Sequence, residues 1–374
     1  MKTSLKVFLL ISVLFLASCK KNNLEDVTAA QLSETVQDEM AKQNIPAMSV
    51  LVFKQDQIVY DEYFGKAHIG NGTDLTANHP FLIASISKVI TGTALLQLAD
   101  QNLISLDDPI NDYLPFQVNV PGYSKKITFR MLLTHTSGIA DGPSLDNEYY
   151  YGTDSPTDLG DFLESYLVPG GSNYSANDNY HDFAPGDDVE YSNVGAALIG
   201  HLVEVISGKD FNTYCKENIF VPLGMSNTHW RLDEISGTIV QPYEYSGGDY
   251  TEIQHYTFTD YPNGGLRTTA RDLHKLFQIF VNAGSSNGQQ ILASGTVTQM
   301  MTPQITDLDD ETGLAFFLLD AAQTIWGHDG GEAGVSTIAG VNATTKVGVI
   351  VFSNMSDANL EGIMLEGYAL GTGE

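Results

Sequence analysis

The apolar and polar positions along the chain follow different periods and predict its main elements. An amphipathic helix is predicted from Thr28, where TAAQLSETVQDEMAKQN places its apolar residues at helical spacing. The segment MSVLVFKQDQIVYDEYFGKAH follows as two strands around the polar turn KQDQ, which predicts a β-hairpin. Residues 81–102 again have the apolar spacing of a helix, and residues 103–250 hold short helices among loops rich in Asp, Asn, Gly, Pro and Tyr.

Regular patterns return after residue 260. Thr269 with Asp272 three residues later predicts a capping box that opens the helix ARDLHKLFQIFVNAG. Four strands are predicted in LAFFLL, TIWGH, GVSTIAGV and KVGVIVFSN, and a closing helix in ANLEGIMLEGYAL. Strands at both chain ends predict an α/β fold with one antiparallel sheet that is built from both ends and flanked by helices. The mainly helical lobe, about 103–250, would be inserted between them.

The first residues have the pattern of a targeting segment. The basic MKTSLK precedes the apolar run VFLLISVLFLA, which is too short to span a membrane comfortably and predicts a signal peptide over residues 1–18. The run ends in LASC, and a cysteine at this point resembles the lipobox of bacterial lipoproteins, which implies lipidation of Cys19. An ordinary signal peptide that happens to contain a cysteine is the alternative. We expect residues 19–27 to be a tether and residues 28–374 to form one domain.

Charge and cysteine content exclude several classes of function. The chain has 18 Lys and Arg against 46 Asp and Glu, so nucleic acid is not expected as a partner. The second cysteine, Cys215, has no partner for a disulfide once Cys19 is lipidated, and we expect it to be half-buried in a helix. No Cys/His spacing typical of a metal site is present, and no metal or cofactor is predicted.

Ser85 and Lys88 stand out near the start of the predicted helix 81–102. Their spacing places both side chains on one face. A serine is a poor nucleophile until a base removes its proton, and an ammonium is no base unless its pKa falls. Lowering a lysine pKa from about 10.4 to near 7 requires roughly 4–5 kcal/mol, which burial on an apolar face supplies. A single Ser-x-x-Lys also arises by chance, so the pair alone is a weak signal.

The tripeptide Tyr191-Ser192-Asn193 follows FAPGDDVE and precedes a helix, which predicts a sharp corner. A tyrosine near a lysine can exist as tyrosinate, so either side chain could accept the serine proton. Asn193 offers an amide that could hold a substrate carbonyl. The alternative is a surface turn with a packed tyrosine.

A third candidate lies in WGHDGGEAGVST, with His328, Gly330 and Gly331. Glycines beside a strand allow a substrate to approach the backbone. A backbone N–H at this place could form an oxyanion hole together with the N–H of Ser85. For His328 by itself, a half-buried histidine with satisfied hydrogen bonds is the simpler interpretation.

The ordered set Ser85-x-x-Lys88, Tyr191-x-Asn193 and His328-x-Gly330 resembles the penicillin-recognising serine hydrolases. This family includes class C β-lactamases, D-alanyl-D-alanine peptidases, D-aminopeptidases and related esterases. The segments LLTHTSGI, FAPG, IFVPLGMSNT and NGGLRTTARDL are similar to it as well, in the right order over roughly residues 30 to 370.

The resemblance implies a β-lactamase-like fold and a role for each residue. Ser85 would be the acylated nucleophile, and Lys88 and Tyr191 the general acid/base pair. Asn193 would position the substrate. The segment from His328 through Gly330 to Gly331 would line the site, with the N–H groups of Ser85 and Gly331 as oxyanion donors.

The departure from the family pattern is His328, because class C β-lactamases and many peptidases carry Lys-Thr-Gly at this place. A lysine at this place presents a permanent positive charge to the carboxylate of a substrate. A histidine with a usual pKa is mostly neutral at pH 7 and becomes more positively charged toward pH 6. The expected activity is therefore hydrolysis of esters, amides or D-peptide and peptidoglycan-type substrates, with weak β-lactamase activity at most. Carboxylate-bearing substrates would improve as the pH falls toward 6.

Several alternatives stay open. GSSNG at 284–288 matches a nucleophile-elbow pattern, but a predicted helix precedes it, so we interpret it as a loop. A penicillin-binding sensor or a non-catalytic scaffold on the same fold is the competing function. The expected partner is a small-molecule or peptide-like substrate. One candidate pocket wall consists of Tyr149, Tyr150, Tyr151, Tyr174 and Tyr180, and ordinary anchoring of the loops by these tyrosines is the alternative. The expected location is a bacterial cell envelope, with a lipid anchor in the membrane and the domain in the periplasm or outside the cell. The oligomeric state is not predicted.

Overall fold

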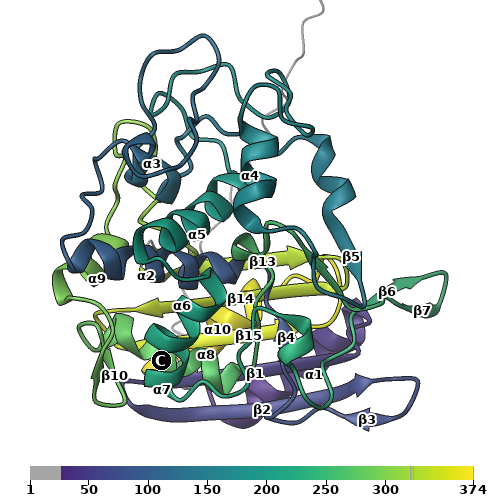
Figure 1. Cartoon of the computed structure of the whole chain (residues 1–374). Coiled ribbons are helices and arrows are strands. Elements are labelled where there is room, and N and C mark those ends of the chain that lie inside the picture. The colour runs from purple at the N-terminus through teal and green to yellow at the C-terminus, as the bar shows by residue number, and fades with distance from the viewer. Residues whose placement is uncertain (1–26, 321, 323, 374) are drawn as a thin grey trace, which may run out of the picture.

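A computed structural model describes residues 27–320, 322 and 324–373 (Figure 1). The predicted signal peptide, Cys19 and nearly all of the predicted tether lie outside the described residues. Within the described part of the chain, no helix is long and apolar enough to cross a membrane.

The core of the molecule is a seven-stranded antiparallel sheet. Its strands lie in the order β12-β13-β14-β15-β1-β2-β3. The first strand of the chain pairs with the last one, as Val50 opposite Val351 illustrates, so the predicted sheet built from both chain ends is confirmed. The strands are β12 (Phe317–Leu318), β13 (Trp326–Glu332), β14 (Val335–Asn342), β15 (Val347–Ser353), β1 (Ala47–Lys54), β2 (Gln57–His68) and β3 (Thr73–Asp74).

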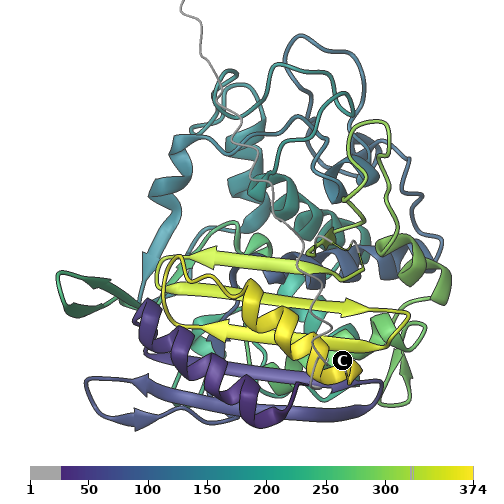
Figure 2. The same cartoon turned by 180° about the vertical axis from the view of Figure 1, so that it is seen from behind.

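Two helices cover the back of the sheet. Figure 2 shows α1 (Ala29–Gln43) and α10 (Glu361–Thr372) lying across the strands on this side. The contact is apolar, because Val349 and Val351 of β15 and Ile363 of α10 belong to one buried cluster. Thr28 caps α1 through its side chain, and the helix ends at Asn44 in the left-handed conformation. The predicted first and last helices are therefore confirmed.

The front of the sheet carries a larger set of helices (Figure 1). α2 (Ser87–Asp100) packs on α5 (Asn193–Ser207), and α8 (Ala270–Val281) contacts β15 and β1. The side chain of Thr269 accepts the N–H of Asp272 at 3.2 Å, as predicted for the start of α8. The inserted lobe adds α3 (Phe129–Leu133), α4 (Leu159–Leu167), α6 (Phe211–Cys215) and α7 (Val221–Leu223), and α9 (Ser294–Met300) follows later.

The remaining elements are short and connect or extend these layers. The strands are β4 (Phe81–Leu82), β5 (Tyr149–Tyr151), β6 (Tyr243–Ser246), β7 (Asp249–Glu252), β8 (Tyr256–Phe258), β9 (Arg267–Thr268), β10 (Ser285–Ser286) and β11 (Gln289–Gln290). The short helices are η1 (Ala84–Ile86), η2 (Ile110–Asp112), η3 (Pro143–Glu148), η4 (Lys216–Phe220), η5 (Leu232–Glu234) and η6 (Tyr261–Asn263).

Two local expectations differ from the structure, whereas the rejection of a nucleophile elbow at GSSNG agrees with it. The predicted strand LAFFLL contributes only Phe317 and Leu318 to the sheet, because the N–H of Ala315 donates to the carbonyl of Leu133 in the helical lobe instead. Cys215 is fully buried rather than half-buried. The segment GSSNG forms the turn between β10 and β11, and the buried Ser286 donates to Gln278 at 2.9 Å, so no nucleophile elbow exists there.

Candidate active site

Ser85 lies in a strained turn between a strand and a helix. β4 pairs with β9, and the chain then turns through η1 into α2. Ala84, directly before Ser85, has φ of +48°, a left-handed conformation that non-glycine residues rarely adopt. Such a conformation persists only where the surroundings hold it, and Ala84 is completely buried. The core therefore fixes the direction in which Ser85 points.

Gly330 brings strand β13 directly against this turn. A Cβ atom at Gly330 would lie 2.6 Å from the carbonyl oxygen of Ile83 and 3.0 Å from the backbone nitrogen of Ser85. No side chain fits in that space, so only glycine permits the contact. Gly330 therefore faces Ser85. Strand β12 pairs with β13 only at Trp326 and Gly327, so Gly331 lies on the part of β13 that β12 does not cover.

Lys88 is buried beside Ser85 and has three hydrogen-bond partners. Its Nζ lies 3.1 Å from Ser85 Oγ, 2.7 Å from Asn193 Oδ1 and 2.8 Å from the backbone carbonyl oxygen of Asn263. Burial lowers the pKa of Lys88 to about 7, and the nearby carboxylates, Asp141 first among them, oppose this shift. A substantial fraction of Lys88 is therefore neutral at neutral pH.

These three contacts direct the lone pair of a neutral Lys88. The oxygens of Asn193 and Asn263 are acceptors only, so they take the two N–H bonds of the neutral amine. The remaining lone pair then faces the hydroxyl of Ser85, which can donate its hydrogen to it. The arrangement is that of a base beside its nucleophile.

Tyr191 lies on the other side of Lys88. Its ring centroid is 4.8 Å from Lys88 Nζ, while 41% of the residue's surface remains exposed. Desolvation raises the pKa of the Tyr191 phenol above its usual value, and the hydrogen bond to Ser85 opposes that shift only in part. The phenol is therefore protonated near neutral pH, which favours Lys88 over a tyrosinate as the base.

His135, in the segment LLTHTSGI, holds Tyr191 in place. The two rings stack with centroids 4.3 Å apart and planes 25° apart. His135 Nδ1 accepts the backbone N–H of Ser192 at 3.1 Å, and burial keeps the pKa of His135 well below its usual value. A neutral ring is thus fixed against the phenol by a backbone hydrogen bond. No pattern in the sequence predicts this role for His135.

Asn193 is held by Asp141 at the start of α5. Asp141 Oδ2 accepts both the side-chain amide and the backbone N–H of Asn193, each at 2.9 Å, and Oδ1 accepts the N–H of Val194 at 3.0 Å. A carboxylate at a helix N-terminus also interacts favourably with the helix dipole. The amide of Asn193 is thereby oriented with its oxygen toward Lys88. Asp141 is a functional residue that the sequence analysis missed.

The third hydrogen-bond partner of Lys88, Asn263, is the first residue of the segment NGGLRTTARDL, and Asp260 lies just before that segment. The side-chain amide of Asn263 donates to both the backbone oxygen and Oδ2 of Asp260 at 2.7 Å. Burial raises the pKa of Asp260 to about 7, and repulsion from Asp141 adds to the shift. Ser87 accepts the N–H of Leu266 at 3.2 Å, so this second serine anchors the same segment and does not contact Lys88.

His328 differs from the expectation for it. Its Nδ1 lies 2.5 Å from the carbonyl oxygen of Asp329, and since a carbonyl only accepts, Nδ1 carries the proton. Its Nε2 is then an acceptor, buried and without a hydrogen-bond partner among the described residues. Burial and the nearby Lys88 lower the pKa of His328 to about 3. The ring therefore stays neutral, and the expected gain of charge toward pH 6 is wrong.

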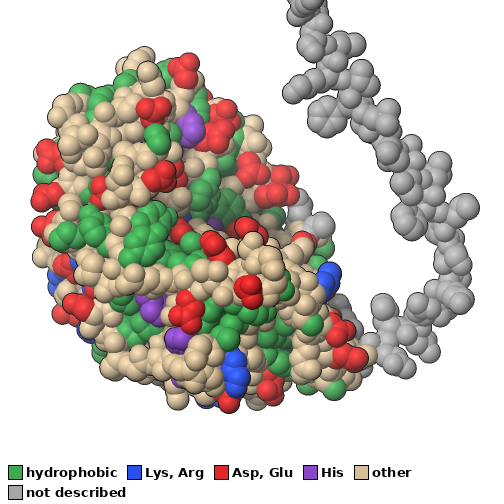
Figure 3. All heavy atoms as spheres, turned by 90° about the vertical axis from the view of Figure 1, so that its right-hand side faces the viewer, with side chains coloured by type: hydrophobic (Ala, Val, Ile, Leu, Met, Phe, Trp, Pro, Cys, Tyr) green, Lys and Arg blue, Asp and Glu red, His purple; other side chains and the backbone are tan. Residues whose placement is uncertain are grey.

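Glu332 ends strand β13 beside a cluster of aromatic rings. Its Oε1 and Oε2 accept the hydroxyl of Tyr149 at 3.2 and 3.4 Å. The Tyr149 ring lies 5.8 Å from that of Tyr256, which lies 6.0 Å from that of Tyr151. Figure 3 shows a hollow on the right-hand face of Figure 1, with apolar side chains inside it and acidic ones along its rim. Tyr149 and Tyr151 thus form an aromatic cluster with Tyr256, and their predicted role as a pocket wall stays a prediction, whereas Tyr180 anchors a loop by donating to the carbonyl of Leu167.

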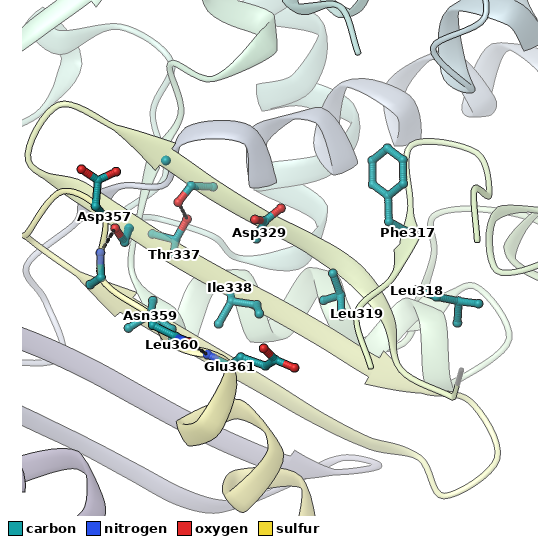
Figure 4. Close-up of a pocket in the computed structure, with 14 residues that line it drawn as sticks. Phe317, Leu318, Leu319, Asp329, Thr337, Ile338, Asp357, Asn359, Leu360 and Glu361 are labelled. Carbon is teal, nitrogen blue, oxygen red and sulfur yellow. Dashed lines mark hydrogen bonds between the residues drawn. The ribbon is translucent and has the colours of Figure 1, made fainter. Parts of the chain in front are cut away.

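A cavity of about 660 Å³ opens beside the site, along β13 and β14 (Figure 4). It shares Gly330 and Gly331 with the site, and the start of α10 forms another part of its wall. Asp329, Asp357 and Glu361 line it, and its described lining contains no Lys, Arg or His. The surroundings of β13 are therefore acidic, with Lys88 as the cation beside Ser85.

The structure brings the predicted site residues together in one place. Ser85, Lys88 and Asn193 are in direct hydrogen-bond contact, and Tyr191 is hydrogen-bonded to Ser85. Gly330 packs on the Ser85 turn, whereas the polar atoms of His328 have no contact with any of them among the described residues. No group of three or more metal-ligating side chains is found in the described part of the chain.

Comparisons with known proteins agree with this geometry. The family model Beta-lactamase matches residues 32–371. Beta-lactamase-like protein 2 of Dictyostelium discoideum is 28% identical over 349 residues, which is 87% of this chain and 61% of that protein. The chain spans between about half and three fifths of the length of the curated relatives it matches.

Solved structures share the fold. The octameric penicillin-binding protein homologue from Pyrococcus abyssi superposes with a TM-score of 0.73 at 22% identity, over 91% of this chain and 76% of that chain. The D-amino acid amidase from Ochrobactrum anthropi SV3 superposes with a TM-score of 0.71 at 20% identity, over 91% of this chain and 97% of that chain. The predicted β-lactamase-like fold is thereby confirmed.

Proposed function

The chain belongs to the beta-lactamase family, and from this premise we propose that it is a hydrolase that cleaves ester or amide bonds through an acyl-enzyme on Ser85. The observation that carries the proposal is the set of contacts around Lys88, which directs the lone pair of the neutral amine at the Ser85 hydroxyl. The lowered pKa of Lys88, about 7, supplies the neutral form. The D-amino acid amidase of the same fold is consistent with amide cleavage.

Acylation follows from these positions. Lys88 takes the proton of Ser85 while Oγ attacks the substrate carbonyl carbon and forms a new C–O bond. The N–H groups of Ser85 and Gly331 would stabilise the oxyanion. The proton then passes to the leaving alcohol or amine as its bond to the carbonyl carbon breaks. Tyr191, which is protonated, can donate its own phenol proton to the leaving group and receive the proton held by Lys88 in exchange.

Deacylation repeats the sequence with water. The same base removes a proton from water, the hydroxyl attacks the ester carbonyl, and Ser85 leaves with the proton returned to it. The amide of Asn193, fixed by Asp141, is available to orient the substrate. Asn193 acts here as a binding residue and takes no proton.

Carboxylate-bearing substrates are disfavoured by this site. His328 stands where many relatives have a lysine, and its low pKa keeps it neutral. Glu332 shares a face of β13 with Gly330, so an incoming carboxylate meets negative charge there. We therefore propose an esterase or D-peptide hydrolase with weak β-lactamase activity at most.

A labelling and turnover experiment tests the proposal. The wild type should react with a fluorophosphonate probe and hydrolyse p-nitrophenyl esters or D-amino acid amides faster than nitrocefin, and Ser85→Ala should do neither. Lasting acylation by labelled penicillin without turnover would instead indicate a penicillin-binding sensor. Failure of every probe to label Ser85 would indicate a non-catalytic scaffold.

The neutral His328 adds a sharper test. Because the pKa of His328 is about 3, the ratio of nitrocefin to ester turnover should stay constant between pH 7 and pH 6. Both rates fall together as the base is protonated. A ratio that rises as the pH falls would show that His328 gains charge and would contradict this account of the site.

The location is a separate proposal, which rests on the sequence LASC alone. We propose a mature chain that begins at a lipidated Cys19 and is attached to a membrane of a bacterial cell envelope. Stable attachment requires more than one acyl chain. Mass spectrometry of the mature N-terminus decides this, and an unmodified terminus elsewhere would contradict it.

A further inference from the structure

We propose that Glu332 binds a protonated amine on the substrate, so that the enzyme prefers esters and amides of amino acids with a free amino group. The inference rests on the proposed hydrolase function and adds a substrate class to it. Four features of the described residues lead to it: the face that Glu332 occupies, its remaining hydrogen-bond capacity, the aromatic rings around it and the charge of the cleft.

Glu332 points to the same side of β13 as the residue that contacts the Ser85 turn. Side chains two positions apart in a strand share a face, and Gly330 faces the backbone of Ser85. Two residues along a strand span about 6.6 Å. An α-amino group lies one carbon away from the reacting carbonyl. A substrate whose carbonyl sits at Ser85 therefore brings this group within reach of the Glu332 side chain.

The carboxylate of Glu332 has acceptor capacity to spare. An ionised carboxylate offers about four lone-pair sites. Those of Glu332 receive the hydroxyl of Tyr149 and the backbone N–H of Ala333. No Lys, Arg or His of the described residues forms an ion pair with Glu332, although Lys88 is near enough to favour its charged form. Burial raises the pKa of Glu332, the direction expected of a carboxylate that lacks a full counter-charge.

Aromatic rings complete the environment of this carboxylate. Tyr149 donates to Glu332 and packs against Tyr256 and Phe258, with centroids 5.8 and 5.5 Å apart. Tyr256 in turn donates to the carbonyl of Ala333, next to Glu332, at 2.8 Å. Ring faces attract cations, and a carboxylate beside them supplies a charged hydrogen-bond acceptor. Tyr256 and Phe258 are almost completely buried, so the half-buried Tyr149 and the carboxylate of Glu332 are the groups that favour an ammonium group over a neutral or anionic one.

The negative charge around the hollow also favours a substrate with a protonated amine. The hydrogen bonds of Lys88 to Ser85, Asn193 and Asn263 leave it no further N–H for a substrate anion. Figure 3 shows acidic side chains gathered around the hollow on this face. A cationic substrate is therefore attracted to the cleft and an anionic one repelled.

Three esters that differ in one group test the proposal. We would measure kcat/KM for the methyl esters of D- and L-alanine and for methyl propionate, which lacks only the amine. The wild type should prefer at least one alanine ester over methyl propionate. In Glu332→Gln the ratio of the preferred alanine ester to methyl propionate should fall by about 10- to 150-fold, as expected for loss of one hydrogen bond to a charged group. Using a ratio cancels any change in the basicity of Lys88, because both substrates share that base.

The matched control is Glu62→Gln, the same chemical change at an exposed position on strand β2. It should leave the ratio at the wild-type value. Glu332→Asp, which retains the charge, should restore part of the preference. Methyl propionate turnover in each variant also reports that the protein is folded.

Two results would overturn the inference alone: a wild type that hydrolyses methyl propionate as well as both alanine esters, or a Glu332→Gln variant with an unchanged ratio. A wild type that hydrolyses no ester or amide and does not react with a fluorophosphonate would instead reject the proposed hydrolase function, and this inference with it.

Discussion

The two faces of the seven-stranded sheet bury different kinds of side chain. The back face packs on α1 and α10 through aliphatic residues, with Val349, Val351 and Ile363 almost completely buried (Figure 2). The front face also has a large apolar core, but it buries Lys88, Asp260 and His328 within it. Aliphatic burial stabilises the fold, whereas burial of ionisable groups costs free energy unless they are paired.

The difference shows that the free-energy cost of burying ionisable groups falls on the front face. On the front face, burial moves the pKa of Lys88 down to about 7 and that of Asp260 up to about 7. Groups with such shifts cluster at functional sites because a base must be neutral near the working pH. The back face holds the scaffold, and the front face holds groups that the fold would be more stable without.

The largest expected effect is that of Ser85→Ala on the front face. Activity should fall by about 10⁴-fold or more, since no other nucleophile is available to the base. The free energy of unfolding should change by less than about 0.5 kcal/mol, because a partly exposed hydroxyl is lost. Hydrolysis assays and chemical denaturation measure the two quantities. Retained turnover would show that the nucleophile is another residue.

The corresponding test on the back face is the substitution Ile363→Ala in α10. Deletion of this fully buried side chain should lower the free energy of unfolding by about 2–5 kcal/mol. The activity per folded molecule should stay within about twofold, because Ile363 packs in the buried cluster of Val349 and Val351, which does not include Ser85 or Lys88. Denaturant titration and active-site counting with a fluorophosphonate would separate the two. A loss of activity per active site would mean that the faces are coupled.

Ser87→Ala sharpens the comparison within the front face. Its hydroxyl accepts the N–H of Leu266, so the substitution leaves a buried donor unsatisfied and should cost about 1–3 kcal/mol of stability. Activity should stay within about threefold, since Ser87 does not touch Lys88. Side-by-side assays with Ser85→Ala check this. Equal losses of activity in both would mean that the nucleophile is misassigned.

The dependence on pH tests the front face without any substitution. The lowered pKa of Lys88 favours its neutral form above about pH 7, and protonation below that value removes the base. The kcat/KM for a neutral ester should therefore fall about tenfold between pH 8 and pH 6. A pH series with one uncharged ester measures it. A rate that begins to rise only near pH 10 would indicate that Lys88 keeps its usual pKa.

The sequence identified the candidate catalytic groups but not the residues that hold them in place. Ser85, Lys88, Tyr191 and Asn193 lie in short motifs, and the structure places them in one cluster. Asp141 reaches Asn193 from 52 residues away, and no local pattern predicts such a contact. His135 and Asn263 occur in segments that resemble the family, which indicated that these segments matter without showing how.

The errors have the same origin. His328 was expected to change its charge near pH 6, because an unperturbed histidine does so. Its pKa depends on burial among Tyr191, Phe317 and Lys88, which come from distant parts of the chain. The prediction of a strand over LAFFLL was wrong for a similar reason. Its apolar spacing fits a strand, but the backbone N–H of Ala315 donates to the carbonyl of Leu133 in the helical lobe. Periodicity reports local structure, and tertiary contacts decide the rest.

The pairing of β1 with β15 has a consequence for how the chain is made. The residues of β1 pair with residues about 300 positions later in the chain, as Val50 opposite Val351 shows. During synthesis the hairpin of β1 and β2 is available early, but the strand that joins it to β13 and β14 is made only about 300 residues later. Contacts of such long range form slowly. A chain interrupted before Val347 would contain every residue of the catalytic cluster, yet it would lack the strand between β14 and β1. A chain that lacks β15 should therefore be inactive, and hydrolysis should begin only after this strand has been made and has paired with β14 and β1.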